Sequence, residues 1–231
     1  MKQVLALLTF AAAVLFALGP VLVPDFGGFD PALYPIPQEN PPVQPAGYAF
    51  AIWGVIYLWL VISTGFGLFK RRDAADWAPA RVPLLVALVV GSAWLPVALV
   101  SPIGAEVLIL LMLVTALIAM DRAPYALFAG WLTAASFAGL GLIGAGYGLL
   151  FGQVGWAWIA VVLALGTALI GHRLRPNAIF YPLGVAWALV AIAVQNAGAV
   201  WSLTLGALLA ALFLALLAAR AYQRHRRGDV V

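Results

Sequence analysis

The chain has 231 residues, of which 65% are hydrophobic and only 9% are charged. A soluble domain carries about 25% charged residues, so the composition excludes that class, and apolar runs of about 20 residues indicate an integral membrane protein built from helices. The absence of cysteine excludes disulfides and thiolate chemistry. The formal net charge is +4, but the basic residues are placed as membrane topology would place them, so no nucleic-acid partner is expected.

Eight apolar segments are predicted to be transmembrane helices. They cover residues 4–23, 48–69, 82–100, 104–120, 125–145, 155–172, 179–195 and 200–222. The shortest have about 17 residues, the lower limit for crossing a bilayer. The first segment, with Lys2 before it, also has features of a cleaved signal peptide. Because its apolar run continues to Val23 without a clear cleavage motif, we favour a retained helix.

The lysine and arginine residues predict the orientation of these helices. In an eight-span arrangement all 12 fall on one side of the membrane, from Lys2 before the first span to Arg227 after the last. The positive-inside rule then places both termini in the cytoplasm and the chain in the cell's inner membrane. The opposite side holds acidic residues, which are Asp25, Asp30, Glu39 and Glu106.

The longest connection on the outer side is formed by residues 24–47. It is rich in proline and glycine, so we expect an extended and irregular backbone. Two interpretations remain open for this segment, because it is either disordered or folded over the helices as a lid.

The sequence shows no residue pattern typical of catalysis. No charged residue lies in the middle of a predicted span, which argues against a proton pump or an ion-coupled carrier. Glu106 lies near the outer end of the fourth span, and we expect it to face water there. Nucleophile motifs, phosphate-binding loops and paired carboxylates are absent, and two histidines are too few for a histidine-built metal site. We therefore predict no enzymatic activity and no required metal or cofactor.

The uncharged polar residues within the spans have two interpretations. They either line a pocket or form hydrogen bonds between helices, and for any one of them the second is favoured. Five glycines near the end of the fifth span indicate close helix packing, within the chain or at a dimer contact. The polar residues are Ser92, Thr133, Ser136, Gln195 and Asn196, and the glycines are Gly139, Gly141, Gly144, Gly146 and Gly148.

Aromatic residues cluster on one face of the second span. Phe50, Trp53 and Tyr57 lie three and four residues apart, so they share a helical face. In the third span Pro96 follows Trp94, and a proline there kinks a helix and opens space beside it. An aromatic face, a kink and a proline-rich cover predict a pocket for a flat apolar ligand. The alternative is aromatic packing in the core of the bundle.

The stretches PAGYAFAIWGVIY, AWLPVAL and YALFAGWLTAAS follow one another along the chain. In this order they resemble the tryptophan-rich sensory protein family, also called the TspO/MBR or translocator protein family. That family has a proline-rich first loop, an aromatic second helix, a Trp-x-Pro in the third helix and a Tyr…Trp pair in the fifth. The resemblance covers the first five predicted spans. The corresponding residues are Phe50, Trp53, Tyr57, Trp94, Pro96, Tyr125 and Trp131.

The resemblance implies a five-helix core with a pocket for porphyrins and other flat hydrophobic ligands, often within a dimer. We expect residues 1–148 to form this core and residues 149–231 to form a three-helix extension with a basic cytoplasmic tail. The expected ligand is a tetrapyrrole or a similar molecule. The expected partners are the lipid bilayer, this small molecule, and a second copy or a larger membrane complex. The expected ligand-binding residues are Tyr48, Phe50, Trp53, Tyr57, Trp94, Pro96, Trp131 and Ser136.

The chain also departs from the family pattern, most clearly at three glycines. Gly91 and Gly139 stand where the family usually has asparagine, and Gly54 stands where threonine is common. The spacing from Phe50 to Trp53 is one residue shorter than in the family. These departures allow a pocket that holds a ligand different from that of the family, or none.

The function predicted from these observations is that of a membrane receptor or sensor that binds a flat hydrophobic ligand in an aromatic pocket. Three alternatives remain open. The first is a transporter of small apolar solutes, which internal repeats or a polar path would favour. The second is a membrane enzyme acting on lipid or isoprenoid, which would need a cluster of titratable groups. The third is an accessory subunit of a larger membrane complex, with the last three helices as its contact surface.

Overall fold

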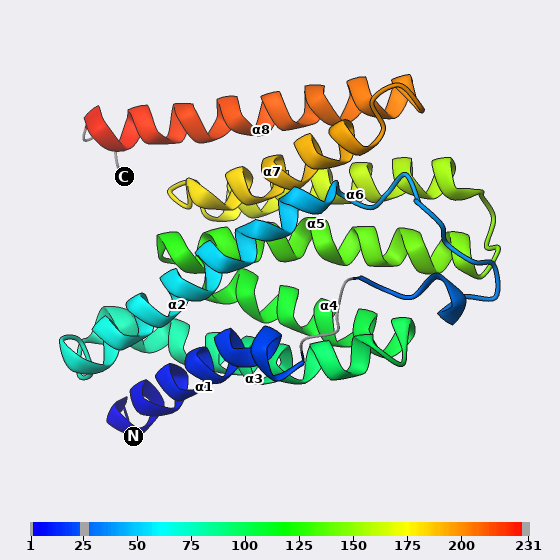
Figure 1. The fold of residues 1–231 in the computed structure, drawn as a ribbon. Helices are drawn as coiled ribbons and strands as arrows, with labels where there is room; N and C mark the ends of the chain where they lie inside the picture. The colour runs from blue at the N-terminus through cyan, green and yellow to red at the C-terminus, as the bar shows by residue number, and fades with distance from the viewer. Residues whose placement is uncertain (1, 24–27, 228–231) are drawn as a thin grey trace.

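The computed structural model describes residues 2–23 and 28–227 and is helical, with no strand in these two ranges (Figure 1). The prediction of an all-α bundle with eight main helices is therefore confirmed. Asp25, one of the acidic residues of the first loop, lies outside the described residues. The helices are α1 (Lys2–Leu22), α2 (Ile52–Phe69), α3 (Ala78–Ala98), α4 (Pro102–Ala119), α5 (Ala123–Gly146), α6 (Gln153–Leu174), α7 (Phe180–Gln195) and α8 (Trp201–Arg227).

Seven of these helices are long and apolar enough to cross a membrane. The exception is α7, which has 16 residues, or about 24 Å at 1.5 Å per residue. Three short 3-10 segments join the helices, η1 (Pro31–Leu33), η2 (Gly47–Ala51) and η3 (Ala75–Trp77). Most of α7 is buried between its neighbours. Because little of this helix faces lipid, it need not be as long as a helix that crosses the bilayer in contact with lipid.

Helix α5 lies in the centre of the bundle (Figure 1). On one side it packs against α2 and α4, and on the other against α6 and α7. Small residues allow this close contact, because a Cβ at Gly184 of α7 would lie only 2.8 Å from the carbonyl oxygen of Leu127 in α5. Similarly, a Cβ at Gly130 of α5 would clash with the carbonyl of Tyr181. Such close approach of backbones is how helices associate where lipid leaves no hydrophobic drive between them.

The remaining helices extend the bundle on both sides of α5. Helix α4 packs on α3, which in turn packs on α1, and α2 crosses between α1 and α5. On the other side α8 packs against α7 and also contacts α6. Since α5 contacts helices from both parts of the chain, the division expected at residue 148 falls inside a continuous set of contacts, and that division stays a prediction.

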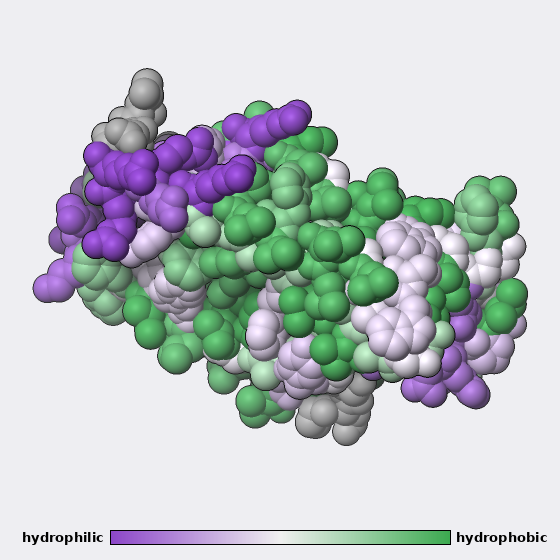
Figure 2. Space-filling view, turned by 90° about the horizontal axis from the view of Figure 1, so that it is seen from above, coloured by the Kyte–Doolittle hydropathy of each residue, from purple (hydrophilic) through white to green (hydrophobic). Residues whose placement is uncertain are grey.

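Successive helices run in opposite directions, so the start of α1 and the end of α8 lie at the same end of the bundle (Figure 1). Figure 2 shows a broad hydrophobic band on the face that carries α8, with hydrophilic residues gathered mainly at the end where α8 finishes. This distribution agrees with the one-sided placement of lysine and arginine in the sequence. The side of the membrane on which this end lies stays a prediction.

Some helices extend beyond the predicted spans because charged residues belong to them, and α3 and α8 show this most clearly. Helix α3 begins at Ala78, before the predicted start at residue 82, and thereby includes Arg81. Helix α8 continues beyond residue 222 through a basic last turn to Arg227. Hydropathy marks only the apolar part of a helix, so it misses turns whose charges are satisfied by the protein or by water.

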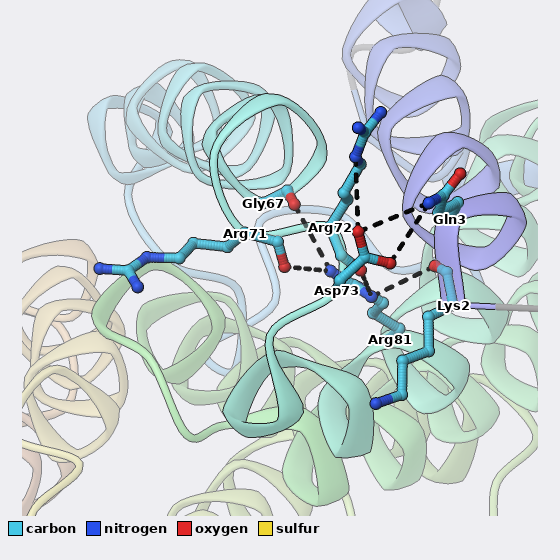
Figure 3. A network of polar contacts seen from close by, with 7 residues as sticks. All are labelled: Lys2, Gln3, Gly67, Arg71, Arg72, Asp73 and Arg81. Atoms are coloured by element: carbon cyan, nitrogen blue, oxygen red, sulfur yellow. Dashed lines mark hydrogen bonds and ion pairs between the residues drawn. The ribbon is translucent and has the colours of Figure 1, made fainter.

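The buried guanidinium of Arg81 joins three segments at this end of the bundle (Figure 3). Arg81 is 5% exposed. Its Nη1 donates to the carbonyls of Lys2 and Arg72, at 3.2 and 2.6 Å. Its Nη2 donates to the carbonyls of Arg71 and Gly67, at 2.8 and 3.4 Å. One side chain of α3 therefore holds the start of α1, the end of α2 and the turn between α2 and α3.

We predict that Arg81→Ala destabilises the fold, because it leaves backbone carbonyls without donors in a buried site. The expected loss is about 2–4 kcal/mol in the free energy of unfolding. Unfolding from mixed micelles, followed by circular dichroism, measures it. The matched control is Arg72→Ala, whose side chain is 60% exposed and pairs with Asp73 at the surface, and which should cost less than about 1 kcal/mol. Equal losses in the two variants would contradict the proposed role of Arg81.

Candidate functional site

A cavity of about 420 Å³ lies between α1, α2, α3 and α4, under the loop that joins α1 to α2. A second chamber of about 80 Å³ adjoins it and extends to α5 and α7. The two chambers share lining residues from the loop and from four helical segments, so we treat them as one site. The shared residues are Gly28, Gln44, Phe50, Trp53, Trp94 and Ile109.

Aromatic rings from four helical segments form one wall of this cavity. Trp53 and Tyr57, one helical turn apart on α2, are stacked with centroids 5.2 Å apart and planes 18° apart. Trp131 of α5 meets Trp53 edge to face at 6.0 Å, and Phe50 of η2 meets Trp131 in the same way at 5.8 Å. Phe16 of α1 closes the group with its centroid 5.0 Å from that of Tyr57. The face predicted from helical spacing therefore continues onto α1 and α5.

The opposite wall is built around Trp94 of α3. Its indole Nε1 donates to the carbonyl of Ala105 in α4, at 3.0 Å, which fixes the ring against the next helix. Phe29 of the loop approaches this ring at 6.1 Å. Gly91, one turn before Trp94, makes room for α1, because a Cβ there would lie 2.5 Å from a ring atom of Phe16. This glycine lets the ring of Phe16 in α1 approach α3.

The loop between α1 and α2 covers the cavity. We call its described part, residues 28–47, the cover loop. Phe29, Gln44 and Pro45 of this loop line the smaller chamber. The backbone N–H of Ile36 donates to the carbonyl of Gly146, the last residue of α5, at 2.8 Å. Of the two interpretations of this segment, a folded cover is the one that the described residues support.

Helix α7 holds the end of the cover loop that precedes α2. The backbone N–H of Ala46 donates to the carbonyl of Ala191 at 3.1 Å. The side chain of Asn196, which is 2% exposed, donates to the carbonyl of Pro42 at 2.8 Å. The helices that follow residue 148 thus contribute to the site by positioning its cover.

Glu106 of α4 lies in the smaller chamber and is only 6% exposed. The prediction that it faces water is therefore wrong. Within the described residues its Oε1 has no hydrogen-bond partner, and its Oε2 lies against Gly139 of α5, where a Cβ would clash with it. The carboxylate is buried because α5 has a glycine at the point where α4 crosses it.

The hydroxyl of Tyr34 in the cover loop also has no hydrogen-bond partner among residues 2–23 and 28–227. Its ring is 4% exposed and packs against Gly146. Burial raises the pKa of this hydroxyl above its ordinary value, and the charge of Glu106 raises it further. The hydroxyl therefore stays protonated and keeps a hydrogen available for donation.

Five of the eight residues expected to bind a ligand lie at the cavity. Phe50, Trp53 and Trp94 line both chambers. Tyr57 lines the larger chamber and Trp131 the smaller one.

The other three expected residues lie elsewhere. Tyr48 is 47% exposed and its ring meets that of Trp187 edge to face. Pro96 occupies the last turn of α3, and Ser136 is fully buried inside α5 with its hydroxyl unpartnered. None of these three lines the cavity.

Two further aromatic residues of the site, Phe16 and Phe29, were not predicted from the sequence. Both belong to segments without a local aromatic pattern, so helical spacing gave no signal for them. Glu106 had a signal in principle, because the unexpected Gly139 marks a space that a neighbouring side chain must fill.

The polar residues of the spans make hydrogen bonds both between helices and within one helix. Thr133 of α5 and Tyr181 of α7 have their hydroxyls 3.2 Å apart, and the hydroxyl of Ser92 donates to the carbonyl of Leu88 within α3. Within residues 2–23 and 28–227, no three histidine, aspartate or glutamate side chains lie together as metal ligands would.

We predict that Asn196→Ala loosens the cover loop without unfolding the bundle. The change removes the hydrogen bond to Pro42, so local opening of the loop becomes easier by about 1–2 kcal/mol, or about 5- to 30-fold. Hydrogen exchange at the amide of Ala46 measures this opening. Asn177→Ala, at an exposed turn before α7, is the control and should leave the exchange unchanged. Unchanged exchange in Asn196→Ala would show that this side chain does not hold the loop.

Comparison with protein-family models matches residues 36–220 to the TSPO-like protein family. The matched segment begins in the cover loop and continues into α8, so it includes Phe50, Trp53, Trp94, Glu106 and Trp131. It extends beyond the five spans in which the resemblance was recognised. Searches among curated proteins and among solved structures gave no match. The aromatic stretches of the sequence predicted this family. Since the family model covers most of the sequence, the chain belongs to the TSPO-like protein family.

Proposed function

We propose that this protein is a membrane receptor or sensor that binds a flat hydrophobic molecule, a tetrapyrrole or a similar compound, in the cavity under the cover loop. The observation that carries the proposal is the meeting of Trp53, Trp94 and Trp131, from three different helices, at one cavity. Aromatic packing in a closed core would explain the same residue types, but it would leave no space between them.

The size and lining of the cavity support this proposal. Sites for small molecules are concave, about 300–1,000 Å³ in volume and mostly apolar, and the larger chamber measures about 420 Å³. The faces and edges of the rings offer stacking surface, which contributes about 0.5–1.5 kcal/mol per aromatic pair beyond the buried area. A planar ligand therefore fits the chemistry of the walls better than a flexible chain does.

The proposed chemistry is limited to binding, sensing and handing over the ligand. Among the described residues that line the two chambers, the titratable groups are the carboxyl of Glu106 and the hydroxyl of Tyr57. They come from different chambers and form no acid–base pair. Membership of the TSPO-like family also points to a sensing or binding role.

We predict that Trp53→Ala weakens the binding of a porphyrin by about 2–4 kcal/mol, because both apolar burial and stacking are lost. This corresponds to an increase in the dissociation constant of about 30- to 1,000-fold. Quenching of the remaining tryptophan fluorescence by titrated porphyrin, in folded and detergent-purified protein, measures it.

The control for this experiment is Trp201→Ala. Trp201 starts α8 and is 67% exposed, so its loss should change the affinity little. Equal affinity in the wild type and in Trp53→Ala would assign the aromatic wall to packing alone. No porphyrin binding in the wild type would favour the accessory-subunit alternative.

The proposal includes an orientation, with both termini in the cytoplasm and the cover loop outside. It rests on the positive-inside rule and on the placement of the described lysine and arginine residues near one end of the bundle. A reporter fused to the C-terminus should show cytoplasmic activity, and one inserted next to Asn40 in the cover loop should not. Cytoplasmic activity of the loop fusion would contradict the orientation.

A further inference from the structure

The carboxylate of Glu106 packs against Gly139, but no hydrogen bond or ion pair from the described residues holds it. It is 94% buried, since 6% of its surface is exposed. Within the described residues its Oε1 accepts no hydrogen bond. A buried carboxylate without a donor is costly, because burial removes its hydration without compensation. A hydrogen-bond donor or a positive charge bound beside the carboxylate would offset this cost.

Glu106 is also not needed to cap helix α4. Ser101 precedes the helix, and its Oγ accepts the backbone N–H of Gly104 at 3.0 Å. The side chain of Ser101 therefore satisfies a free N–H donor of the first turn. Glu106 lies further along the helix, with its side chain at the cavity.

The surroundings of the carboxylate suit a nitrogen-bearing aromatic cation. Aromatic rings of Phe29, Phe50, Trp53, Trp94 and Trp131 line the same chamber. Ring faces attract organic cations, and this attraction is larger where water is excluded. None of the described lining residues is a lysine or arginine, so the chamber contains no positive charge of its own to neutralise Glu106.

We propose that Glu106 determines the ligand class of the cavity, which is a planar aromatic molecule carrying a positively charged or N–H-donating nitrogen. This inference rests on the proposed binding function. In the complex the nitrogen donates to the unpartnered Oε1 while the ring system stacks within the aromatic walls. A charge-assisted hydrogen bond of this kind is about twice as strong as a neutral one. A ligand with negative groups must keep them away from Glu106.

Two probes of similar shape test this inference. Proflavine is a planar tricyclic cation with amino groups, and anthracene is the uncharged tricyclic hydrocarbon. In Glu106→Gln the side chain keeps its size but loses its charge, so proflavine should bind about 10- to 100-fold more weakly. Anthracene should bind within about threefold of its wild-type affinity, because stacking is unchanged. Fluorescence titration in detergent micelles gives both constants.

Two controls separate the site from nonspecific partition into the micelle. Glu39→Gln removes an exposed carboxylate of the cover loop and should leave both constants unchanged. Trp53→Ala should weaken both probes, since it removes a ring of the shared wall. If Glu106→Gln does not fold, Glu106→Asp is the second variant, because it keeps the charge on a side chain that is one methylene shorter. Proflavine should then bind more weakly, while the affinity for anthracene stays unchanged.

The outcomes distinguish this inference from the function on which it rests. If both probes bind, depend on Trp53 and are indifferent to Glu106→Gln, the cavity binds ligands and the role of Glu106 is overturned. If neither probe binds to the wild type, both the binding function and the inference are overturned. A selective loss of proflavine in Glu106→Gln supports both.

Discussion

The close approach of α5 to α7 is the constraint on which the rest of the structure depends. Neither Gly130 nor Gly184 has room for a side chain, because each faces backbone of the other helix. Lipid provides no hydrophobic drive for this contact, so its stability comes from dense packing of small residues. The contact brings the end of α7 close to the cover loop, where Ala191 accepts a backbone hydrogen bond. The cavity is thus shaped by helices on both sides of α5.

The same principle recurs where aromatic rings meet glycines of neighbouring segments. The rings of Phe16, Tyr34 and Trp156 occupy the spaces left open at Gly91, Gly146 and Gly144. Trp77 and Trp158, which membrane-interface preference would also explain, pack against Gly67 and Gly206 in the same way. Each large ring is therefore positioned by the absence of a side chain opposite it.

The helices and much of the aromatic wall could be predicted from the sequence, whereas the polar centre of the cavity could not. Apolar length identifies a span without knowledge of its neighbours, and the spacing of Trp53 and Tyr57 places both on one face. The position of Glu106 depends on what α5 offers opposite it. Gly139, at a position where the family usually has asparagine, leaves the space that this carboxylate fills. The unexpected glycine of α5 and the acidic residue of α4 thus meet at one point of the structure.

The fastening of the cover loop at its middle and at its end before α2 has a consequence for the kinetics of exchange. Backbone hydrogen bonds hold the loop to α5 at Ile36 and to α7 at Ala46, so a molecule inside the cavity cannot leave through this face until at least one of them breaks. Release by this route is then limited by local opening of the protein and not by diffusion.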